Sequence, residues 1–327
     1  MIIHSYTSPG VKHVRRAQLS QDYVITATID EKTRIIAVSD GVSSARFARN
    51  AAIAACYGAV NFSRNYPGLK SIFNNSAVSE TFAKELLQHV GVTIEKLSKK
   101  NHGCMSDYAA TLLVVIVTED HYVLAIQLGD GFINIDGTNL AFKHADPHRK
   151  NVTFSTANLL NFDRNIYSVY RGRFSSCVIA MSDGLAPISD NRQLIRYLCG
   201  DVSIFGNIAA LREVCGACSE LNFDDTTIAI VTDPIAFIAR LSMREQLTLF
   251  GLKERAIRLK NGNLNQYVRV FNAYHTPRSI AEVASIAHIN AITVSKITRH
   301  LYKRNLLKKV GRYAVAGYAV EEAKRKV

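Results

Sequence analysis

Arg34-Ile-Ile-Ala-Val-Ser-Asp40-Gly41 and Cys177-Val-Ile-Ala-Met-Ser-Asp183-Gly184 are near copies of one pattern, an apolar run rich in β-branched residues that ends in Ser-Asp-Gly. Such runs are typical of buried strands. Asp-Gly alone is also a strong signal for a hairpin turn. Here, however, a long helical segment or an irregular loop follows instead of a partner strand. The two segments therefore predict buried strands that end at Asp40 and Asp183.

The fold class follows from further strand-like runs and from two helical segments. The helical patterns, with apolar residues three and four apart, occupy Ala45–Phe62 and Val78–Leu97. Because the strands are many and do not strictly alternate with helices, the pattern predicts an α+β fold, a β-sandwich flanked by helices, rather than a doubly wound sheet. The expected strands are Tyr23–Ile29, Arg34–Ser39, Ala110–Val117, Tyr122–Gln127, Cys177–Met181 and Thr226–Val231.

More aspartates stand at strand ends. Gly129-Asp130-Gly131 follows the fourth expected strand, Asp22 begins the first, and Asp224-Asp225 precedes the last. For Asp136-Gly137, between two apolar runs, a hairpin turn is expected. Carboxylates at the strand ends of one sandwich can converge, and a bare cluster of them would repel itself strongly.

An oxygen-rich site without His or Cys ligands selects hard ions such as Mg²⁺ or Mn²⁺. Two such ions about 3.5–4 Å apart turn a shared water into a hydroxide nucleophile and absorb charge on a phosphoryl group. The acidic residues therefore predict metal-dependent phosphoryl chemistry.

The order of these motifs resembles that of the metal-dependent serine/threonine phosphatases of the 2C type, in particular a bacterial branch. The similarity covers roughly residues 1–233. Each motif is weak alone, whereas the ordered set is fairly specific. The matching segments are Gly10-x-x-His13, Ser20-Gln21-Asp22, Ile36–Ala45, Ala110–Leu113, Gly129-Asp130-Gly131, Ala180–Gly184 and Asp224–Thr227.

The resemblance implies a hydrolase that dephosphorylates phosphoserine and phosphothreonine without a covalent intermediate, using two or three Mn²⁺ or Mg²⁺ ions. It implies that Asp40 bridges two metals and that the Gly41 carbonyl binds one of them. Asp183 and Asp224 match ligands of the other metal, so Asp40 and Asp183 would hold the ions that make the attacking hydroxide. The remaining implied ligands are Asp22, directly or through water, and Asp130, in a third and weaker site.

Two features of the family differ here. Many members carry an Arg five residues before the early Asp that grips the phosphate, and this position is Ala17. Arg15, Arg16 or Arg46 could bind phosphate in its place, and we expect this role for Arg16 and Arg46. The His that follows the first Asp-Gly in eukaryotic members is Val42. Both differences keep open the alternative of a degenerate phosphatase-like domain.

The charge of the 327-residue chain, formally +13, is unevenly distributed. Residues 240–327 contain 18 Lys and Arg but 5 Asp and Glu, whereas residues 1–239 contain 22 of each sign. A neutral body joined to a basic segment usually indicates two functions, the second with an anionic partner such as nucleic acid. A solvated basic surface is the alternative interpretation.

The basic segment predicts a connecting helix over 235–262 and a small, mainly helical domain over 263–327. Ser279-Ile-Ala-Glu282 has the spacing of a capping box, and a second helix is expected over Ala291–Arg304. Gly311-Arg312 lies between two short apolar runs as the turn of a hairpin. Helix, turn, helix and hairpin together resemble a winged helix-turn-helix domain.

We expect the cationic side of the second helix, with the hairpin, to contact duplex DNA. Winged helices also serve as docking and dimerisation modules, so a protein partner or a homodimer is an alternative. The predicted DNA contacts are Thr293, Lys296, Arg299, His300, Lys303 and Arg312.

The composition of the chain excludes several classes of protein. With 48% hydrophobic residues, 18 Gly and 6 Pro, the chain is neither collagenous nor wholly disordered. Its best apolar run, Leu112–Val117, is far shorter than the ~20 residues of a spanning helix. Six scattered cysteines indicate a reducing compartment. For Cys215-x-x-Cys218, within a helical pattern, we expect a structural role, and for His144–His148 a surface loop.

The sequence thus predicts a cytoplasmic, bacterial, Mn²⁺- or Mg²⁺-dependent phosphoprotein phosphatase over 1–234, without membrane contact, fused to a DNA-binding module. The competing hypothesis is a DNA-binding regulator whose degenerate phosphatase-like domain senses a ligand or a phosphorylated partner.

Overall fold

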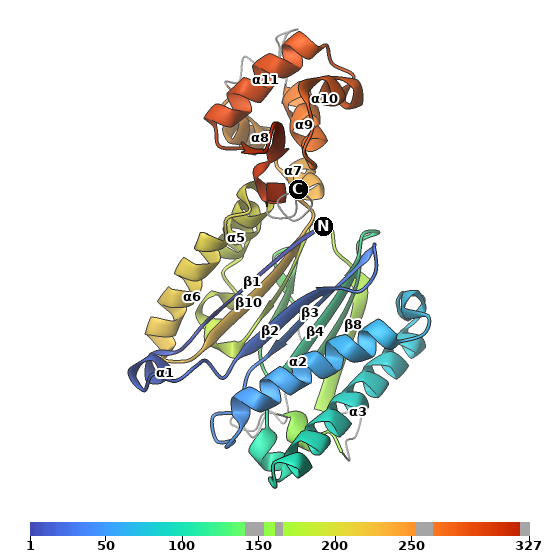
Figure 1. Ribbon diagram of the computed structural model, residues 1–327, viewed down its shortest axis with the longest axis vertical. Coiled ribbons are helices and arrows are strands. Elements are labelled where there is room, and N and C mark those ends of the chain that lie inside the picture. The colour runs from blue at the N-terminus through green and yellow to red at the C-terminus, as the bar shows by residue number, and fades with distance from the viewer. Residues whose placement is uncertain (141–153, 161–165, 253–263, 321–327) are drawn as a thin grey trace. The chain divides into compact units, whose positions relative to one another are not determined.

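The structure is a computed structural model of the chain that describes residues 1–140, 154–160, 166–252 and 264–320 (Figure 1). The chain divides into two compact units. The N-terminal unit comprises Ile3–Arg196 and Ile208–Val231, and the C-terminal unit comprises Met1–Ile2, Tyr197–Asn207 and Thr232–Val327. The division therefore falls inside helix α5 (Arg192–Phe205) as well as near the expected boundary at residue 234.

The N-terminal unit is built on two five-stranded sheets. Neighbouring strands of the first sheet pair antiparallel, so that Ile36 lies opposite both Thr26 and Val115. Strand β9 of the second sheet contacts β3 and β4 of the first, so the two sheets face each other. The first sheet has the order β2 (Tyr23–Thr28), β3 (Thr33–Ser39), β4 (Leu112–Thr118), β5 (Tyr122–Leu128) and β8 (Tyr167–Arg173); the second has the order β1 (Ile2–Ser8), β10 (Thr226–Thr232), β9 (Cys177–Met181), β6 (Phe132–Ile135) and β7 (Thr138–Asn139).

Helices α2 (Ala48–Asn65) and α3 (Ser76–Lys100) pack on the outer face of the first sheet (Figure 1). Their small and apolar side chains, such as Ala55 and Leu86, join Ile35 and Val114 of the sheet in one buried cluster. Both faces of β3 and β4 are therefore covered, which is why these strands appear in the sequence as continuous apolar runs. All six expected strands are present, with bounds within two residues of those predicted.

Three further helices belong to this unit, α1 (Val11–Arg15), α4 (Ala186–Ser189) and α6 (Ile208–Asn222). Cys215 and Cys218 are buried in α6 as free thiols. The Thr226 hydroxyl donates a hydrogen bond to the Cys215 carbonyl at 3.1 Å, which joins the helix to the start of β10. This environment agrees with the structural role expected for the two cysteines. Asp136-Gly137 forms the turn between β6 and β7, as predicted, with φ of 51° and 88°.

In the C-terminal unit, the single helix expected over 235–262 is, where the structure describes it, two helices. They are α7 (Pro234–Arg240) and α8 (Met243–Phe250), because Ser242 and Glu245 form a capping box that starts a new helix. The expected capping box at Ser279 and Glu282 is present. The later elements are α9 (Leu264–Ala273), α10 (Ile280–Ala287), α11 (Ala291–Lys303), β11 (Leu307–Val310) and β12 (Tyr313–Ala316).

Helices α10 and α11 are bent by 110° from each other, and the two strands after them pair as the expected hairpin. Buried Phe271, Val283, Ile297 and Leu301 hold these elements together. Within the described ranges, no single helix is long and apolar enough to cross a membrane, although α10 and α11 taken together reach that length and composition.

Candidate metal centre

Asp40 directly follows β3, and its backbone is held by Thr111. The Asp40 amide donates to the Thr111 hydroxyl at 3.0 Å, and the Thr111 amide donates to the Asp40 carbonyl at 2.8 Å. Gly41 forms a β-bridge with Ala110. A side chain at Gly41 would come within 2.8 Å of the Ala48 backbone, so glycine allows α2 to begin this close to the strand end.

Asp183 follows β9 and lies beside the start of β10. The Ser182 amide donates to the Thr227 carbonyl, and the Thr227 amide donates to the Ser182 hydroxyl, both at 2.9 Å. At Gly184 a Cβ atom would lie 1.9 Å from the carbonyl oxygen of Asp225, closer than any side chain tolerates. The loops that carry Asp183 and Asp225 are therefore in direct backbone contact.

Asp130 lies in a turn that two glycines make possible. Gly129 and Gly131 have φ of 93° and 121°, which residues other than glycine rarely adopt. The side-chain amide of Gln127 donates to the carbonyl oxygens of both glycines, at 3.0 and 3.2 Å. This turn keeps Asp130 close to Asp183: after burial, the charge of Asp130 is the main influence that raises the pKa of Asp183.

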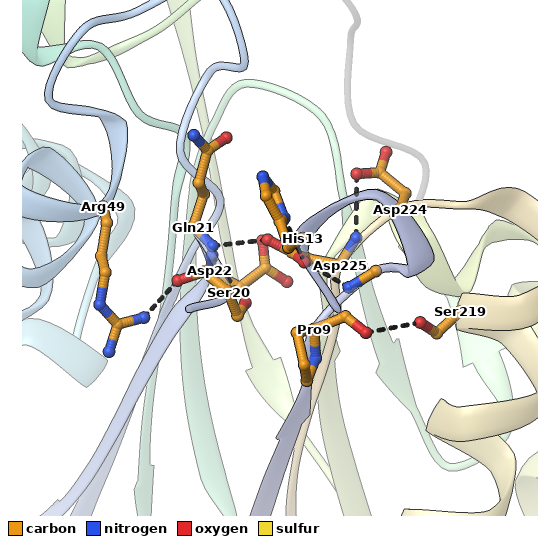
Figure 2. Close-up of polar contacts among 10 residues, drawn as sticks. Pro9, His13, Ser20, Gln21, Asp22, Arg49, Ser219, Asp224 and Asp225 are labelled. Atoms are coloured by element: carbon orange, nitrogen blue, oxygen red, sulfur yellow. Dashed lines mark hydrogen bonds and ion pairs between the residues drawn. The ribbon is translucent and has the colours of Figure 1, made fainter. Parts of the chain in front are cut away.

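Asp225 ties the first loop of the chain to the last strand of the sheet, as Figure 2 shows. Its buried carboxylate accepts hydrogen bonds from the amides of Gly10 and Gln21, both at 2.5 Å, and His13 Nδ1 lies 2.8 Å from the same group. Because Asp22 follows Gln21, this anchor also sets the position of Asp22. Asp224 is exposed, and its carboxylate accepts from the Asp225 amide at 2.9 Å.

The electrostatics show that the predicted acidic residues converge. Burial raises the pKa of Asp40 well above its usual range, and the charges of Asp22 and Asp183 raise it further. Burial and the charges of Asp130 and Asp224 likewise raise the pKa of Asp183. Carboxylates influence one another in this way when they lie within a few Å. Asp22 and Asp183 therefore lie beside Asp40, and Asp130 and Asp224 lie near enough to Asp183 for their charges to act on its carboxyl.

Asp22 is the most deeply buried member of this acidic cluster, with 1% of its surface exposed. Burial raises its pKa to about 7, although interactions with Asp40, Ser182 and Thr227 act in the opposite direction. These neighbours lie close to Asp22, yet among the described residues neither carboxylate oxygen of Asp22, nor Oδ1 of Asp183, is in hydrogen-bonding geometry with a donor. Buried acceptors left without donors are destabilising.

Most of the aspartates described above lie in a part of the chain that matches a known protein family. Residues 9–207 match the family model of protein phosphatase 2C. The match covers more than half of the chain and includes Asp22, Asp40, Asp130 and Asp183.

The chain belongs to the protein phosphatase 2C family.

It is thereby a serine/threonine protein phosphatase by family, and solved phosphatase structures share its fold. Stp1 from Staphylococcus aureus is 12% identical, over 71% of this chain and 94% of its own, with a TM-score of 0.55. The serine/threonine phosphatase of S. agalactiae is 14% identical over 71% and 99%, with a TM-score of 0.52. The catalytic domain of PstP, in complex with two manganese ions, is 12% identical over 70% and 96%, with a TM-score of 0.50. No curated protein sequence matches the chain significantly.

The side chains of this phosphatase 2C domain fit a hard divalent cation. The carboxylate oxygens of Asp22 and Asp183 that lack a donor are all-oxygen ligands of the kind that Mg²⁺ and Mn²⁺ prefer. One cation can neutralise several of them at once, which a hydrogen-bond donor cannot do. Within the described ranges no three Asp, Glu, His or Cys side chains already stand in a metal-binding geometry.

The two expected phosphate-binding arginines are both exposed, and neither is buried in the acidic cluster. The guanidinium of Arg46 lies 5.0 Å from the centre of the Phe47 ring. Hydrogen bonds from Cys104 lower the pKa of Asp107, and the charge of Arg46 lowers it further. Arg49 was not predicted, yet its guanidinium donates to the Ser20 carbonyl beside the Asp22 loop (Figure 2). Arg49 lies within α2, four residues after the segment Ile36–Ala45, and none of the quoted motifs includes it.

The predicted DNA contacts on α11 separate into two groups. Lys296, Arg299 and Lys303 are exposed. The Thr293 amide donates to the Asn290 side chain, which caps the helix.

His300 lies apart from the exposed group, because its Nε2 is 2.8 Å from the Phe250 carbonyl of α8 and its ring packs edge-on against Tyr267. Arg312 is exposed in the hairpin turn, 5.1 Å from the Tyr313 ring. The expected surface loop at His144–His148 lies outside the described residues.

Proposed function

We propose that this protein is a Mn²⁺- or Mg²⁺-dependent phosphoserine and phosphothreonine protein phosphatase with a DNA-binding module at its C-terminus. In this proposal, residues 1–234 form the phosphatase domain and residues 263–327 the winged helix-turn-helix module. The observation that carries the enzymatic part is the group of buried, unpaired carboxylate oxygens of Asp22 and Asp183, which lie beside Asp40.

Asp40 and Asp183 would hold the ions, together with Asp22, Asp130, Asp224 and the carbonyl of Gly41. Bound there, the ions would lower the pKa of a bound water and offset charge on the phosphoryl group. Asp225 holds the loop that carries Asp22, and Thr111 holds the backbone of Asp40. Arg16 and Arg46, both exposed, are the proposed contacts for phosphate oxygens.

The test is Mn²⁺-dependent release of phosphate from a phosphothreonine peptide by the full chain. Asp40→Asn should abolish the activity, because it removes one of the negative charges that would hold the ions. Glu31→Gln is the matched control, since Glu31 is an exposed acid outside the cluster, and it should leave the rate unchanged. A wild-type protein that neither binds Mn²⁺ or Mg²⁺ nor releases phosphate would contradict the proposal and favour a degenerate, ligand-sensing domain.

The DNA-binding part is supported by the shape and charge of the C-terminal elements. A bend of 110° between α10 and α11 lies within the range of DNA-binding helix pairs. Exposed Lys296, Arg299 and Lys303 follow one another along α11, and the sequence between Glu282 and Glu321 contains no acidic residue. Lys296→Ala should weaken binding to duplex DNA of any sequence, whereas Lys84→Ala on α3 should not.

A further inference from the structure

We infer that the segment Val11–Leu19, which comprises α1 and the turn after it and is here called the docking loop, binds acidic stretches of the phosphorylated protein substrate. The inference rests on the proposed phosphatase function and deepens it, because it names the class of substrate. It concerns residues outside the metal centre itself, and it assigns a role to a loop whose cations have no structural partner among the described residues.

The docking loop is fixed at the edge of the acidic cluster. Gly10, just before it, donates to one oxygen of the Asp225 carboxylate, and Gln21, just after it, donates to the other. The Ser219 hydroxyl donates to the Pro9 carbonyl at 2.9 Å, which attaches the same end to α6 (Figure 2). Asp22, a member of the cluster, follows Gln21 directly. A peptide whose phosphoryl group entered the metal centre would therefore pass close to this loop.

The docking loop also has a defined internal shape. The amide of Val14 donates to the Gly10 carbonyl at 2.9 Å, and the amides of Arg16 and Gln18 donate to the His13 carbonyl at 3.1 and 2.8 Å. His13 itself is held by Asp225, with 18% of its side chain exposed. A surface ordered in advance loses little conformational entropy when a partner binds.

The chemistry of the exposed side chains identifies the partner. Lys12, Arg15 and Arg16 are exposed, and within the described ranges none of them forms a salt bridge. Residues 1–21 contain no Asp or Glu that could neutralise them. Val14 and Leu19 stand among these cations with 60% and 71% of their surface exposed. Three unpaired cations with two exposed apolar side chains complement a segment that carries acidic and apolar residues around its phosphorylated residue.

The experiment compares substrates of the full chain in Mn²⁺. It uses two phosphothreonine peptides of equal length, one with acidic and one with basic flanking residues, and p-nitrophenyl phosphate as a substrate that has no flanking residues. Wild type should prefer the acidic peptide. The double variant Lys12→Glu/Arg15→Glu should lower kcat/KM for that peptide about tenfold, mainly through KM, because two attractions become repulsions. Its rate on p-nitrophenyl phosphate should not change.

Lys96→Glu/Lys100→Glu on α3 is the matched control, since it makes the same change of net charge with exposed residues of another element. It should leave the peptide preference intact. An unaltered preference in the docking-loop variant, or equal use of both peptides by wild type, would overturn the inference while the phosphatase activity stands. An equal loss on p-nitrophenyl phosphate would also overturn it, since the loop would then act on the metal centre. Wild type inactive on every substrate would contradict the proposed function, and the inference with it.

Discussion

Asp22 is a residue at which stability and function oppose each other. Burial raises the pKa of its carboxyl from 3.8 to about 7. In the metal-free protein, the folded state therefore keeps a proton between these two values that the unfolded state releases. The contribution of this group to the free energy of unfolding is thus fully present below pH 4 and falls as the pH rises toward 7.

Asp22→Asn should consequently stabilise the metal-free protein. At pH 8 the substitution removes a buried charge without a partner, and we expect the free energy of unfolding to rise by roughly 1–3 kcal/mol. Urea denaturation in the presence of a chelator measures this value. At pH 5, where the wild-type carboxyl is protonated, the two proteins should differ less. A variant that is less stable than wild type at pH 8 would show that Asp22 is not strained by burial.

Asp225 should matter more for stability than its neighbour Asp224. Asp225→Ala leaves the amides of Gly10 and Gln21 without their acceptor, which should cost about 2–4 kcal/mol. Asp224→Asn keeps an oxygen for the Asp225 amide on an exposed side chain and should change stability by less than about 0.5 kcal/mol. Equal effects of the two substitutions in thermal or urea unfolding would contradict this difference.

For single residues of the acidic cluster, the sequence predicts which residue types are involved better than it predicts what each residue does. The convergence of Asp40, Asp183 and Asp130 was predictable because each follows a strand with a strong apolar pattern. Asp224 and Asp225 are chemically identical neighbours, so only tertiary contacts distinguish the exposed candidate ligand from the buried anchor. The link between His13 and Asp225 joins the two ends of the domain's sequence, and no local pattern contains it.

Strands that are buried on both faces were easier to predict from the sequence than strands at the edge of a sheet. Strands β3, β4 and β9 lie inside their sheets and have continuous apolar patterns, so their bounds were predicted closely. Strands β1 and β8 are edge strands with half-buried residues, and their mixed sequences lack a strong strand pattern. The expected helix over 235–262 was wrong where it crosses Ser242, although Ser242 and Glu245 have the spacing that starts a helix.

The contact between the η5 turn (Asp183–Leu185) and the start of β10 can be tested by adding one methyl group. Gly184→Ala would place its Cβ 1.9 Å from the Asp225 carbonyl oxygen, so the two loops must separate. We expect a loss of about 3 kcal/mol or more in the free energy of unfolding, together with loss of metal binding.

The matched substitution is Gly216→Ala in α6, where a Cβ would meet no atom of the described residues within 4 Å. It should stabilise the protein by about 0.5–1 kcal/mol, because alanine favours a helix over glycine. If Gly184→Ala were as well tolerated as Gly216→Ala in urea denaturation, the close contact between the two acidic loops would be incorrect.

For the molecule as a whole, the uneven charge predicts that the two proposed activities respond differently to salt. Residues 1–239 are neutral in sum, and residues 240–327 carry the net charge of +13. If Lys296, Arg299 and Lys303 each neutralise one DNA phosphate, affinity for duplex DNA should fall about 40-fold between about 50 and 200 mM salt. Hydrolysis of p-nitrophenyl phosphate by the same full-length protein should change little. DNA binding that does not respond to salt would favour protein docking instead.

If the acidic cluster is a divalent metal centre, calorimetric titration of Mn²⁺ into the full-length protein should detect binding there. We expect wild type to bind Mn²⁺ with release of protons, because Asp22 and its neighbours hold protons in the metal-free state. Asp40→Asn should weaken or abolish this binding, and Glu31→Gln should not. Wild type without measurable Mn²⁺ binding, or binding that Asp40→Asn leaves unchanged, would contradict the account.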